Sequence, residues 1–223
     1  METKDSMPLH NIQAVLFDLD GTLLDTHDLL LETFHHTVRT VLKRTIPDEV
    51  LMAKVGQPLD TQMWDFTDDQ AEHDELCRVY REYNAVIHDD WIKVFPGIAL
   101  LLDELSDAGV PLGVVTSKRH AAALRGLSRF NLEGSFKFVV GSDDWPTHKP
   151  DPGPVAHGCD LLGIAPQQCL YVGDSPFDMQ AGNGAGCPTA AALWGMFSRP
   201  TLEAQNPTYV CSTPADIIPL VIG

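Results

Sequence analysis

The chain has 223 residues and a formal net charge of −16, which argues against binding to nucleic acids or to anionic membranes. Hydrophobic residues make up 44 % of it, enough for a substantial core, and its length allows one large domain or two small ones. The five cysteines form no CxxC pair, which predicts reduced thiols and a cytoplasmic location. The first ten residues are polar and no stretch approaches membrane-spanning length, so we expect neither a targeting segment nor a membrane anchor.

Short apolar runs recur along the chain and are typical of buried strands. The leucines within 97–109 and 119–130, which lie between such runs, repeat at helical spacing. Alternation of strands and helices favours right-handed βαβ units, so we expect an α/β fold with a Rossmann-like parallel sheet. The predicted strands are 14–18, 111–116, 136–140, 169–173, 189–193 and 209–212.

One long interval interrupts this alternation with helical patterns and no convincing strand. Its first helix carries Leu30 and Phe34 on one face, and a later helix carries Leu76 and Tyr80 on one face. An insertion placed after the first strand would stand over the edge of the sheet where α/β proteins bind ligands. The predicted domains are a core of residues 1–25 and 94–223 and a small helical cap of residues 26–93.

Two carboxylates stand where the first predicted strand ends, in the run Asp18-Leu19-Asp20-Gly21-Thr22. Residues i and i+2 of an extended backbone point to the same side, so the side chains of Asp18 and Asp20 converge. Paired carboxylates in this position suit a divalent metal ion and chemistry that combines a nucleophile with a general acid and base. For this run taken alone, an acidic loop with a turn glycine is the alternative.

Three further segments fit the same scheme. Thr116 and Ser117 close the second core strand, Lys149 precedes a proline, and Asp174 closes a later strand with Asp178 shortly after it. Together with the aspartate run, this ordered set resembles the four signature motifs of the haloacid dehalogenase superfamily of phosphohydrolases. The resemblance extends over essentially the whole chain, and it implies a Rossmann-like core that carries a cap.

The resemblance implies a role for each catalytic candidate. Asp18 matches the nucleophile that attacks phosphorus and forms an aspartyl-phosphate, and Asp20 matches the general acid that later acts as the base for water. Thr116 would give its hydroxyl, and Ser117 its backbone N–H, to the phosphoryl oxygens. Lys149 would hold Asp18 against the phosphate by offsetting the repulsion between two anions.

The resemblance also implies a bound Mg²⁺ ion. Its ligands would be Asp174, Asp18 and the backbone carbonyl of Asp20, because Mg²⁺ prefers hard oxygen ligands. Asp178 would support these ligands without binding the ion itself. The ion would neutralise charge on the transferring phosphoryl group, which an acidic protein cannot otherwise attract easily.

Within the superfamily, the intact Asp20 favours rapid hydrolysis of a phosphate ester. The insertion resembles the small helical cap, of the C1 type, found in the phosphoglycolate phosphatase group and in a related bacterial pyrophosphatase. The leading substrate is therefore a small phosphomonoester of the 2-phosphoglycolate kind. The alternatives are inorganic pyrophosphate, a sugar or nucleotide monophosphate and, from other functional classes, a phosphomutase or a non-catalytic protein of the same fold.

Three polar residues of the insertion, Gln57, Arg78 and Arg81, are candidates for contacting the leaving group of the substrate. Solvated charges on a helix face are the alternative interpretation of each. The expected partner is a small phosphorylated metabolite, and we expect a monomer or a homodimer.

Overall fold

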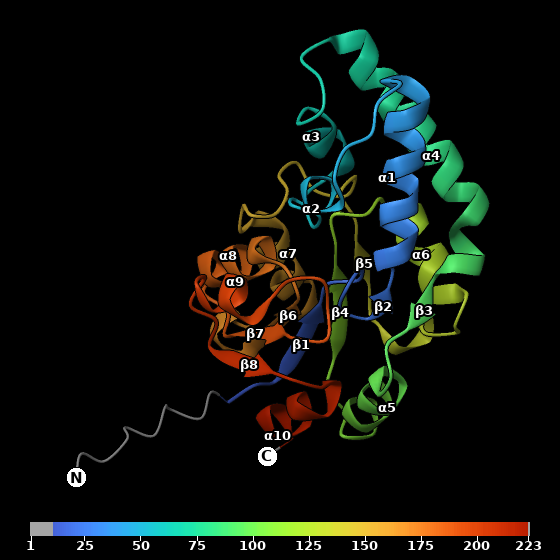
Figure 1. Ribbon diagram of the computed structural model, residues 1–223. Coiled ribbons are helices and arrows are strands. Elements are labelled where there is room, and N and C mark those ends of the chain that lie inside the picture. The colour runs from blue at the N-terminus through green and yellow to red at the C-terminus, as the bar shows by residue number, and fades with distance from the viewer. Residues whose placement is uncertain (1–10, 223) are drawn as a thin grey trace.

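A six-stranded parallel sheet forms the centre of the molecule, in the order β5-β4-β1-β6-β7-β8 (Figure 1). The computed structural model describes residues 11–222, so the predicted polar N-terminal segment lies outside the described part. All six predicted strands are present and the α/β fold is confirmed, although the run 136–140 forms a strand only at its end. The strands are β1 (Ala14–Phe17), β4 (Leu112–Val115), β5 (Val139–Val140), β6 (Cys169–Gly173), β7 (Thr189–Ala192) and β8 (Tyr209–Cys211).

Helices cover both faces of this sheet, because alternate residues of each strand point to opposite faces. Val15 and Phe17 pack in one apolar cluster with residues of α5 and α6, whereas Ala14 and Leu16 pack in another with residues of α7 and α8. The helices after the insertion are α5 (Ile98–Asp107), α6 (His120–Ser128), α7 (Gly153–Leu162), α8 (Pro176–Ala185), α9 (Arg199–Glu203) and α10 (Ile218–Val221). Three short 3₁₀ helices are η1 (Glu133–Ser135), η2 (Pro166–Gln168) and η3 (Pro214–Ile217).

The helices that follow β1 have an apolar cluster of their own. The ring of Phe34 in α1 lies 5.0 Å from the ring of Tyr80 in α4 and 6.1 Å from that of Phe66, measured between centroids. Phe34 and Tyr80 belong to the predicted apolar faces, which the structure therefore confirms. Asp69 caps the N-terminus of α4, because its carboxylate accepts a hydrogen bond of 2.9 Å from the backbone N–H of Glu72. The helices are α1 (His27–Val41), α2 (Asp48–Leu51), α3 (Leu59–Met63) and α4 (Gln70–Trp91).

Two short strands that the sequence did not predict join this helical segment to the rest of the molecule. β2 (Leu24–Asp25) and β3 (Lys93–Val94) pair antiparallel, with Leu24 opposite Val94. A pair of two-residue strands is too short to show a period of two, so no sequence pattern revealed it. The pairing brings the two chain segments that leave and re-enter the core side by side.

The order of the strands decides where the site forms. β1 lies between β4 and β6, so the carboxyl ends of three strands meet at one edge of the sheet. Open α/β sheets bind ligands at this edge, and α1 to α4 stand beside it in the structure (Figure 1). Within residues 11–222, no helix combines the length and apolar composition needed to cross a lipid bilayer. The five cysteines are buried free thiols, as their spacing predicts.

Candidate active site

Three buried carboxylates meet at the carboxyl edge of the sheet. Asp18 directly follows β1 and Asp174 directly follows β6, whereas Asp178 lies in the first turn of α8. One oxygen atom of each lies within 4.8 Å of the others. Ser175 and Asp178 form a capping box at the start of α8, which fixes the Asp178 carboxylate in place.

Lys149 joins two of these carboxylates. Its ammonium Nζ lies 2.7 Å from Oδ1 of Asp18 and 2.5 Å from Oδ1 of Asp178, and the residue is 3 % exposed. The hydroxyl of Tyr171 donates a further hydrogen bond of 3.1 Å to the same oxygen of Asp178. The predicted neighbourhood of Lys149 and Asp18 is therefore present, and Asp178 takes part in it directly.

The cluster changes the proton affinity of its members. Burial raises the pKa of Asp18 to about 7 against the opposing effect of the Lys149 ammonium, and the Asp178 carboxylate adds to the rise. Burial also raises the pKa of Asp174 well above its usual value, with Asp178 and Asp18 adding to it. Burial would lower the pKa of Lys149, but the carboxylates of Asp178 and Asp18 raise it well above its usual value.

This charge pattern fits a divalent cation. When all three carboxyl groups are ionised, they and the one ammonium leave two negative charges in a buried site, and uncompensated buried charge is costly. Both oxygens of Asp178 already accept hydrogen bonds from Lys149, Tyr171 and Ser175. Asp18 and Asp174 are therefore better placed to bind an ion, with Asp178 supporting them.

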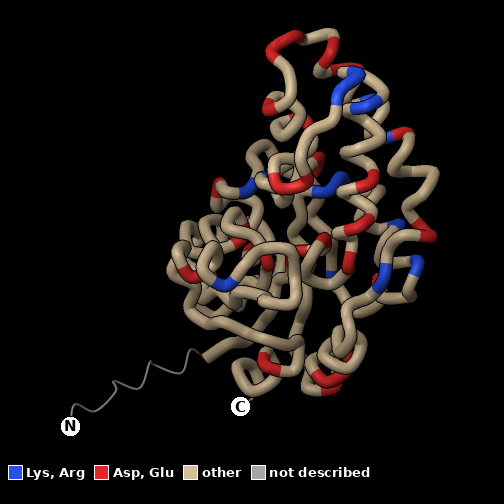
Figure 2. The backbone as a smooth tube through the Cα atoms, viewed as in Figure 1, with Lys and Arg blue, Asp and Glu red and all other residues tan. Residues whose placement is uncertain are grey.

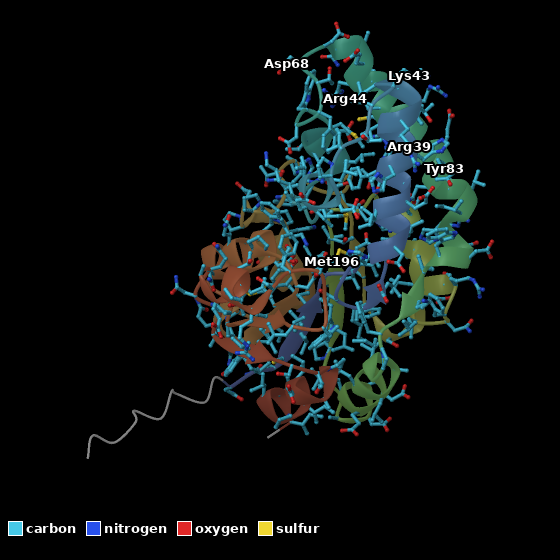
Figure 3. The ribbon with its side chains drawn as sticks, in the orientation of Figure 1. Arg39, Lys43, Arg44, Asp68, Tyr83 and Met196 are labelled. Atoms are coloured by element: carbon cyan, nitrogen blue, oxygen red, sulfur yellow. The ribbon has the colours of Figure 1, made fainter. Side chains whose placement is uncertain are left out.

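The Asp174 carboxylate is held in place by neighbours that the sequence did not single out. Oδ1 accepts a hydrogen bond of 3.2 Å from the hydroxyl of Thr22, and Oδ2 accepts one of 2.7 Å from the backbone N–H of Met196. A Cβ atom at Gly21 would lie 2.2 Å from Oδ2, so only glycine leaves room for this carboxylate. Met196 also packs against the apolar cluster of the helical insertion, at its boundary with the core (Figure 3).

Asp20 has a partner that sequence reasoning missed. The Nζ atom of Lys118 lies 2.9 Å from Oδ1 of Asp20 and 3.1 Å from Oδ2, so the ammonium contacts both carboxylate oxygens. The side chain of Lys118 is 10 % exposed and that of Asp20 is 18 % exposed. Lys118 directly follows Thr116 and Ser117 at the end of β4. Its position next to these two candidate phosphate-binding residues was the one feature of the sequence that could have indicated a role in the site.

Thr116 and Ser117 directly follow β4, which pairs with β1, the strand that Asp18 directly follows. The backbone N–H of Thr116 continues the sheet by donating to the carbonyl of Val140, whereas its hydroxyl oxygen accepts from the N–H of Lys118 at 3.2 Å. The hydroxyl of Ser117 donates a hydrogen bond of 2.6 Å to the carbonyl oxygen of Gly56. Ser117 therefore contacts the insertion directly.

A cavity of about 390 Å³ connects these groups to the insertion helices. Its core side is lined by Asp18, Asp20, Thr116, Ser117 and Lys118. Its opposite side is lined by residues of the segment from α1 to α4, including Leu30, Phe34, Val55, Gln57, Tyr80 and Arg81. The insertion therefore lies across the cavity from Asp18 and Asp20.

The three candidates of the insertion have different positions. Gln57 and Arg81 line the cavity, and Arg81 pairs with Asp60 at 2.6 Å. Arg78 is not among the lining residues, and its guanidinium pairs with Glu75 and Glu82 on an exposed helix face. We therefore no longer assign a substrate contact to Arg78. The apolar residues of the cavity wall were predicted as core and not as part of a site.

The sequence of this chain is similar to those of known hydrolases. Residues 15–192 match the family model described as haloacid dehalogenase-like hydrolase. The chain belongs to this family. It is 35 % identical over 208 residues to the pyrophosphatase PpaX of Bacillus velezensis, covering 93 % of this chain and 95 % of that protein. The resemblance inferred from the four motifs is thereby confirmed, and so is the assignment of a hydrolase.

Two solved structures have the same fold. A haloacid dehalogenase-like family hydrolase from Streptococcus pneumoniae is 25 % identical, with a TM-score of 0.83 over 94 % of this chain and 98 % of that one. A predicted phosphoglycolate phosphatase from Haemophilus somnus is 24 % identical, with a TM-score of 0.87 over the same shares of the two chains. The likeness extends through the core and the helical insertion alike.

Proposed function

We propose that this chain is a Mg²⁺-dependent phosphatase that hydrolyses a small phosphomonoester through an aspartyl-phosphate on Asp18. The observation that carries the proposal is the Asp18 carboxylate, held 2.7 Å from Lys149 at the base of a cavity that Thr116 and Ser117 also line. A carboxylate so fixed is a suitable nucleophile for attack on phosphorus. The family membership of the chain supports this reading.

The proposed first step forms the bond between Asp18 and phosphorus and breaks the bond to the leaving oxygen. The ammonium of Lys149 limits the repulsion between the attacking carboxylate and the phosphoryl oxygens. The Thr116 hydroxyl and the Ser117 N–H would hold these oxygens, as the family resemblance implies. Asp20 would give a proton to the leaving oxygen and would take one from water when that water releases phosphate from Asp18.

The proposed Mg²⁺ ligands are carboxylate oxygens of Asp18 and Asp174 and the backbone carbonyl oxygen of Asp20. The buried carboxylates and the raised pKa values of Asp18 and Asp174 support this choice, because a cation would relieve the repulsion between them. When bound, Mg²⁺ would neutralise negative charge on the phosphoryl group. Asp178 would orient the site from its position on Lys149 and Ser175.

We further propose that residues 26–93 act as a cap domain that selects the leaving group. The wall formed by α1 to α4 faces the predicted phosphoryl site across the cavity, which supports this assignment. A closed cap would also exclude bulk water during phosphoryl transfer. The core residues would then act on any phosphoryl group that reaches Asp18.

Three kinds of substrate are candidates, and different observations favour the first two. The cap resembles that of the phosphoglycolate phosphatase group, which favours a phosphomonoester of the 2-phosphoglycolate kind. The pyrophosphatase name of the Bacillus velezensis relative favours inorganic pyrophosphate. The same proposed catalytic residues could also hydrolyse a sugar or nucleotide monophosphate, and no single observation favours that substrate. A phosphomutase or a non-catalytic role is less favoured, because the predicted catalytic residues are all present.

The deciding experiment is a phosphate-release assay over small phosphoesters and pyrophosphate, with and without Mg²⁺. We expect phosphate release that depends on Mg²⁺. When the reaction of a substrate with a labelled phosphoryl group is quenched with acid, we expect the label to be found on Asp18. A protein that releases no phosphate from any ester, or that works equally well after exhaustive chelation, would contradict the proposal. Transfer of the phosphoryl group to a second hydroxyl, with little free phosphate, would instead identify a mutase.

A further inference from the structure

We infer that the leaving group of the substrate is uncharged and partly apolar. Among the substrates considered above, this inference disfavours pyrophosphate and 2-phosphoglycolate, because their leaving groups are charged. It favours the monophosphate ester of an alcohol with a hydrocarbon face. This inference rests on the proposed phosphatase function, because it concerns the same cavity. Three observations carry it: the size of the cavity, its apolar wall and the pairing of its cations.

The cavity is larger and less polar than a second phosphate needs. Its volume of about 390 Å³ lies in the range of sites for organic ligands, about 300–1,000 Å³. Leu30, Phe34, Val55 and Tyr80 line it and are each at most 8 % exposed. The hydrocarbon of a ligand placed against this wall is removed from water, which is worth about 25 cal/mol for each Å², whereas an anion placed there loses hydration and gains no partner.

Each cation of the cavity already has a carboxylate partner. Each of the four arginine and lysine residues that line it forms an ion pair with a carboxylate of this chain. The pairs are Arg81–Asp60 at 2.6 Å, Lys118–Asp20 at 2.9 Å, Arg125–Asp89 at 3.0 Å and Arg119–Asp143 at 3.4 Å. Lys149, at the base of the site, is likewise held between Asp18 and Asp178.

An anionic leaving group would therefore have to compete with these carboxylates. Displacing Asp20 from Lys118 would disturb a proposed catalytic residue, and displacing Asp60 from Arg81 would leave that carboxylate beside a second anion. The protein as a whole adds repulsion, since its formal net charge is −16 and acidic residues lie on both the insertion and the core (Figure 2). A neutral alcohol meets none of these costs.

The first test compares leaving groups on the intact protein with Mg²⁺. We would measure kcat/KM for methyl, butyl and hexyl phosphate, for 2-phosphoglycolate and for pyrophosphate. If the apolar wall binds the chain, kcat/KM should rise about threefold to fourfold per added methylene, from about 0.8 kcal/mol per buried CH₂. Higher kcat/KM for pyrophosphate or 2-phosphoglycolate than for hexyl phosphate would overturn the inference.

The second test frees one cation. Asp60→Asn removes the partner of Arg81 on an exposed part of the insertion, where the Asp60 side chain is 63 % exposed. We expect the ratio of kcat/KM for 2-phosphoglycolate to that for hexyl phosphate to rise about tenfold, as expected when a charge-assisted contact becomes available. Asp68→Asn is the matched control, because Asp68 lies at the tip of the insertion and does not line the cavity (Figure 3). An unchanged ratio in Asp60→Asn would overturn the argument from paired cations.

The outcomes separate this inference from the proposed function. Absence of phosphate release from every ester, including an aryl phosphate, would remove the proposed function and this inference with it. Turnover of esters with a preference for anionic leaving groups would remove only the inference. Leu30→Asn tests the apolar wall directly: it should lower kcat/KM for hexyl phosphate far more than for methyl phosphate, and equal losses for the two esters would contradict the role of the wall.

Discussion

The hydroxyl of Ser117 donates a hydrogen bond of 2.6 Å to the backbone carbonyl of Gly56. Ser117 belongs to the sheet edge that holds the carboxylates, and Gly56 belongs to the insertion. This bond therefore connects the two parts of the cavity wall next to the proposed phosphoryl site. Gly56 also lies close to Ser175 at the start of α8, since a Cβ atom at Gly56 would lie 2.8 Å from Oγ of Ser175.

The contact predicts unequal effects of two small changes. Ser117→Ala removes one hydrogen bond, worth about 0.5–1.5 kcal/mol, so kcat/KM should fall by about tenfold at most. Gly56→Ala should cost more, because the residue has φ +103° and its new Cβ would clash with Ser175. Steady-state kinetics of both variants provide the comparison.

Gly163→Ala controls for backbone strain in that experiment. Gly163 also has a positive φ, of 67°, but a Cβ atom there meets nothing within 4 Å. We expect this variant to lose some thermal stability and to keep its kcat/KM. If Gly56→Ala behaved in the same way, the position of the Gly56 loop against the core would be irrelevant to turnover.

Asp18→Asn should abolish turnover without unfolding the protein. The amide cannot attack phosphorus, whereas the substitution removes a buried charge whose pKa is already raised by burial. Lys149 keeps its contact with Asp178 in the variant. Circular dichroism should show an intact fold, and Asp103→Asn on the exposed face of α5 should retain full activity. Substantial turnover by folded Asp18→Asn would exclude Asp18 as the nucleophile.

The affinity of the site for Mg²⁺ should decrease at low pH, because protons compete with the ion for the Asp18 carboxylate. The folded-state pKa of Asp18 is about 7, above its usual value of 3.8, so a proton competes with the ion below pH 7. The affinity for Mg²⁺ should therefore weaken by up to about tenfold per unit as the pH falls below 7, from this one proton. Calorimetric titration at pH 8, 7 and 6 measures this slope.

The raised pKa of Asp18 also makes the stability of the folded protein depend on pH. A carboxyl whose pKa is raised on folding keeps its proton in the folded protein while the unfolded chain has already lost it. The metal-free protein should therefore lose stability as the pH rises from about 4 to about 7, and Mg²⁺ should restore it above pH 7. Asp174→Ala should remove this Mg²⁺ effect on the melting temperature. A melting temperature that ignores Mg²⁺ at pH 8 would contradict the proposed site.

Much of the core could be predicted from the sequence because its signals are local. The strand before Asp18 is a continuous apolar run, and the residues that close each strand follow directly from it. The contacts of the site could not be predicted in the same way. Tyr171 reaches Asp178 from the middle of a buried strand, and the N–H of Met196 reaches Asp174 from a loop after β7. Such contacts depend on how distant segments pack.

The cavity wall illustrates a second limit. Phe34 and Tyr80 show the helical spacing of core residues, and they do pack together in the core of the insertion. They also face the cavity, and nothing in a helical period distinguishes these two roles. The ion pairs of Arg81 and Lys118 were similarly invisible, because Asp60 and Asp20 lie far from them in sequence.

Lys118 offers the last prediction. Its ammonium contacts both oxygens of Asp20, at 2.9 and 3.1 Å, and so fixes the direction in which that carboxylate points. If Asp20 gives a proton to the leaving oxygen, Lys118→Met should lower kcat for alkyl phosphates by about tenfold or more, within the usual range for general acid catalysis. An aryl phosphate with a good leaving group, such as p-nitrophenyl phosphate, needs little protonation and should lose much less. Lys118→Arg keeps the positive charge and should recover part of the alkyl phosphate activity. Equal losses for alkyl and aryl phosphates in Lys118→Met would show that Lys118 supports the fold or the phosphoryl site and does not orient Asp20.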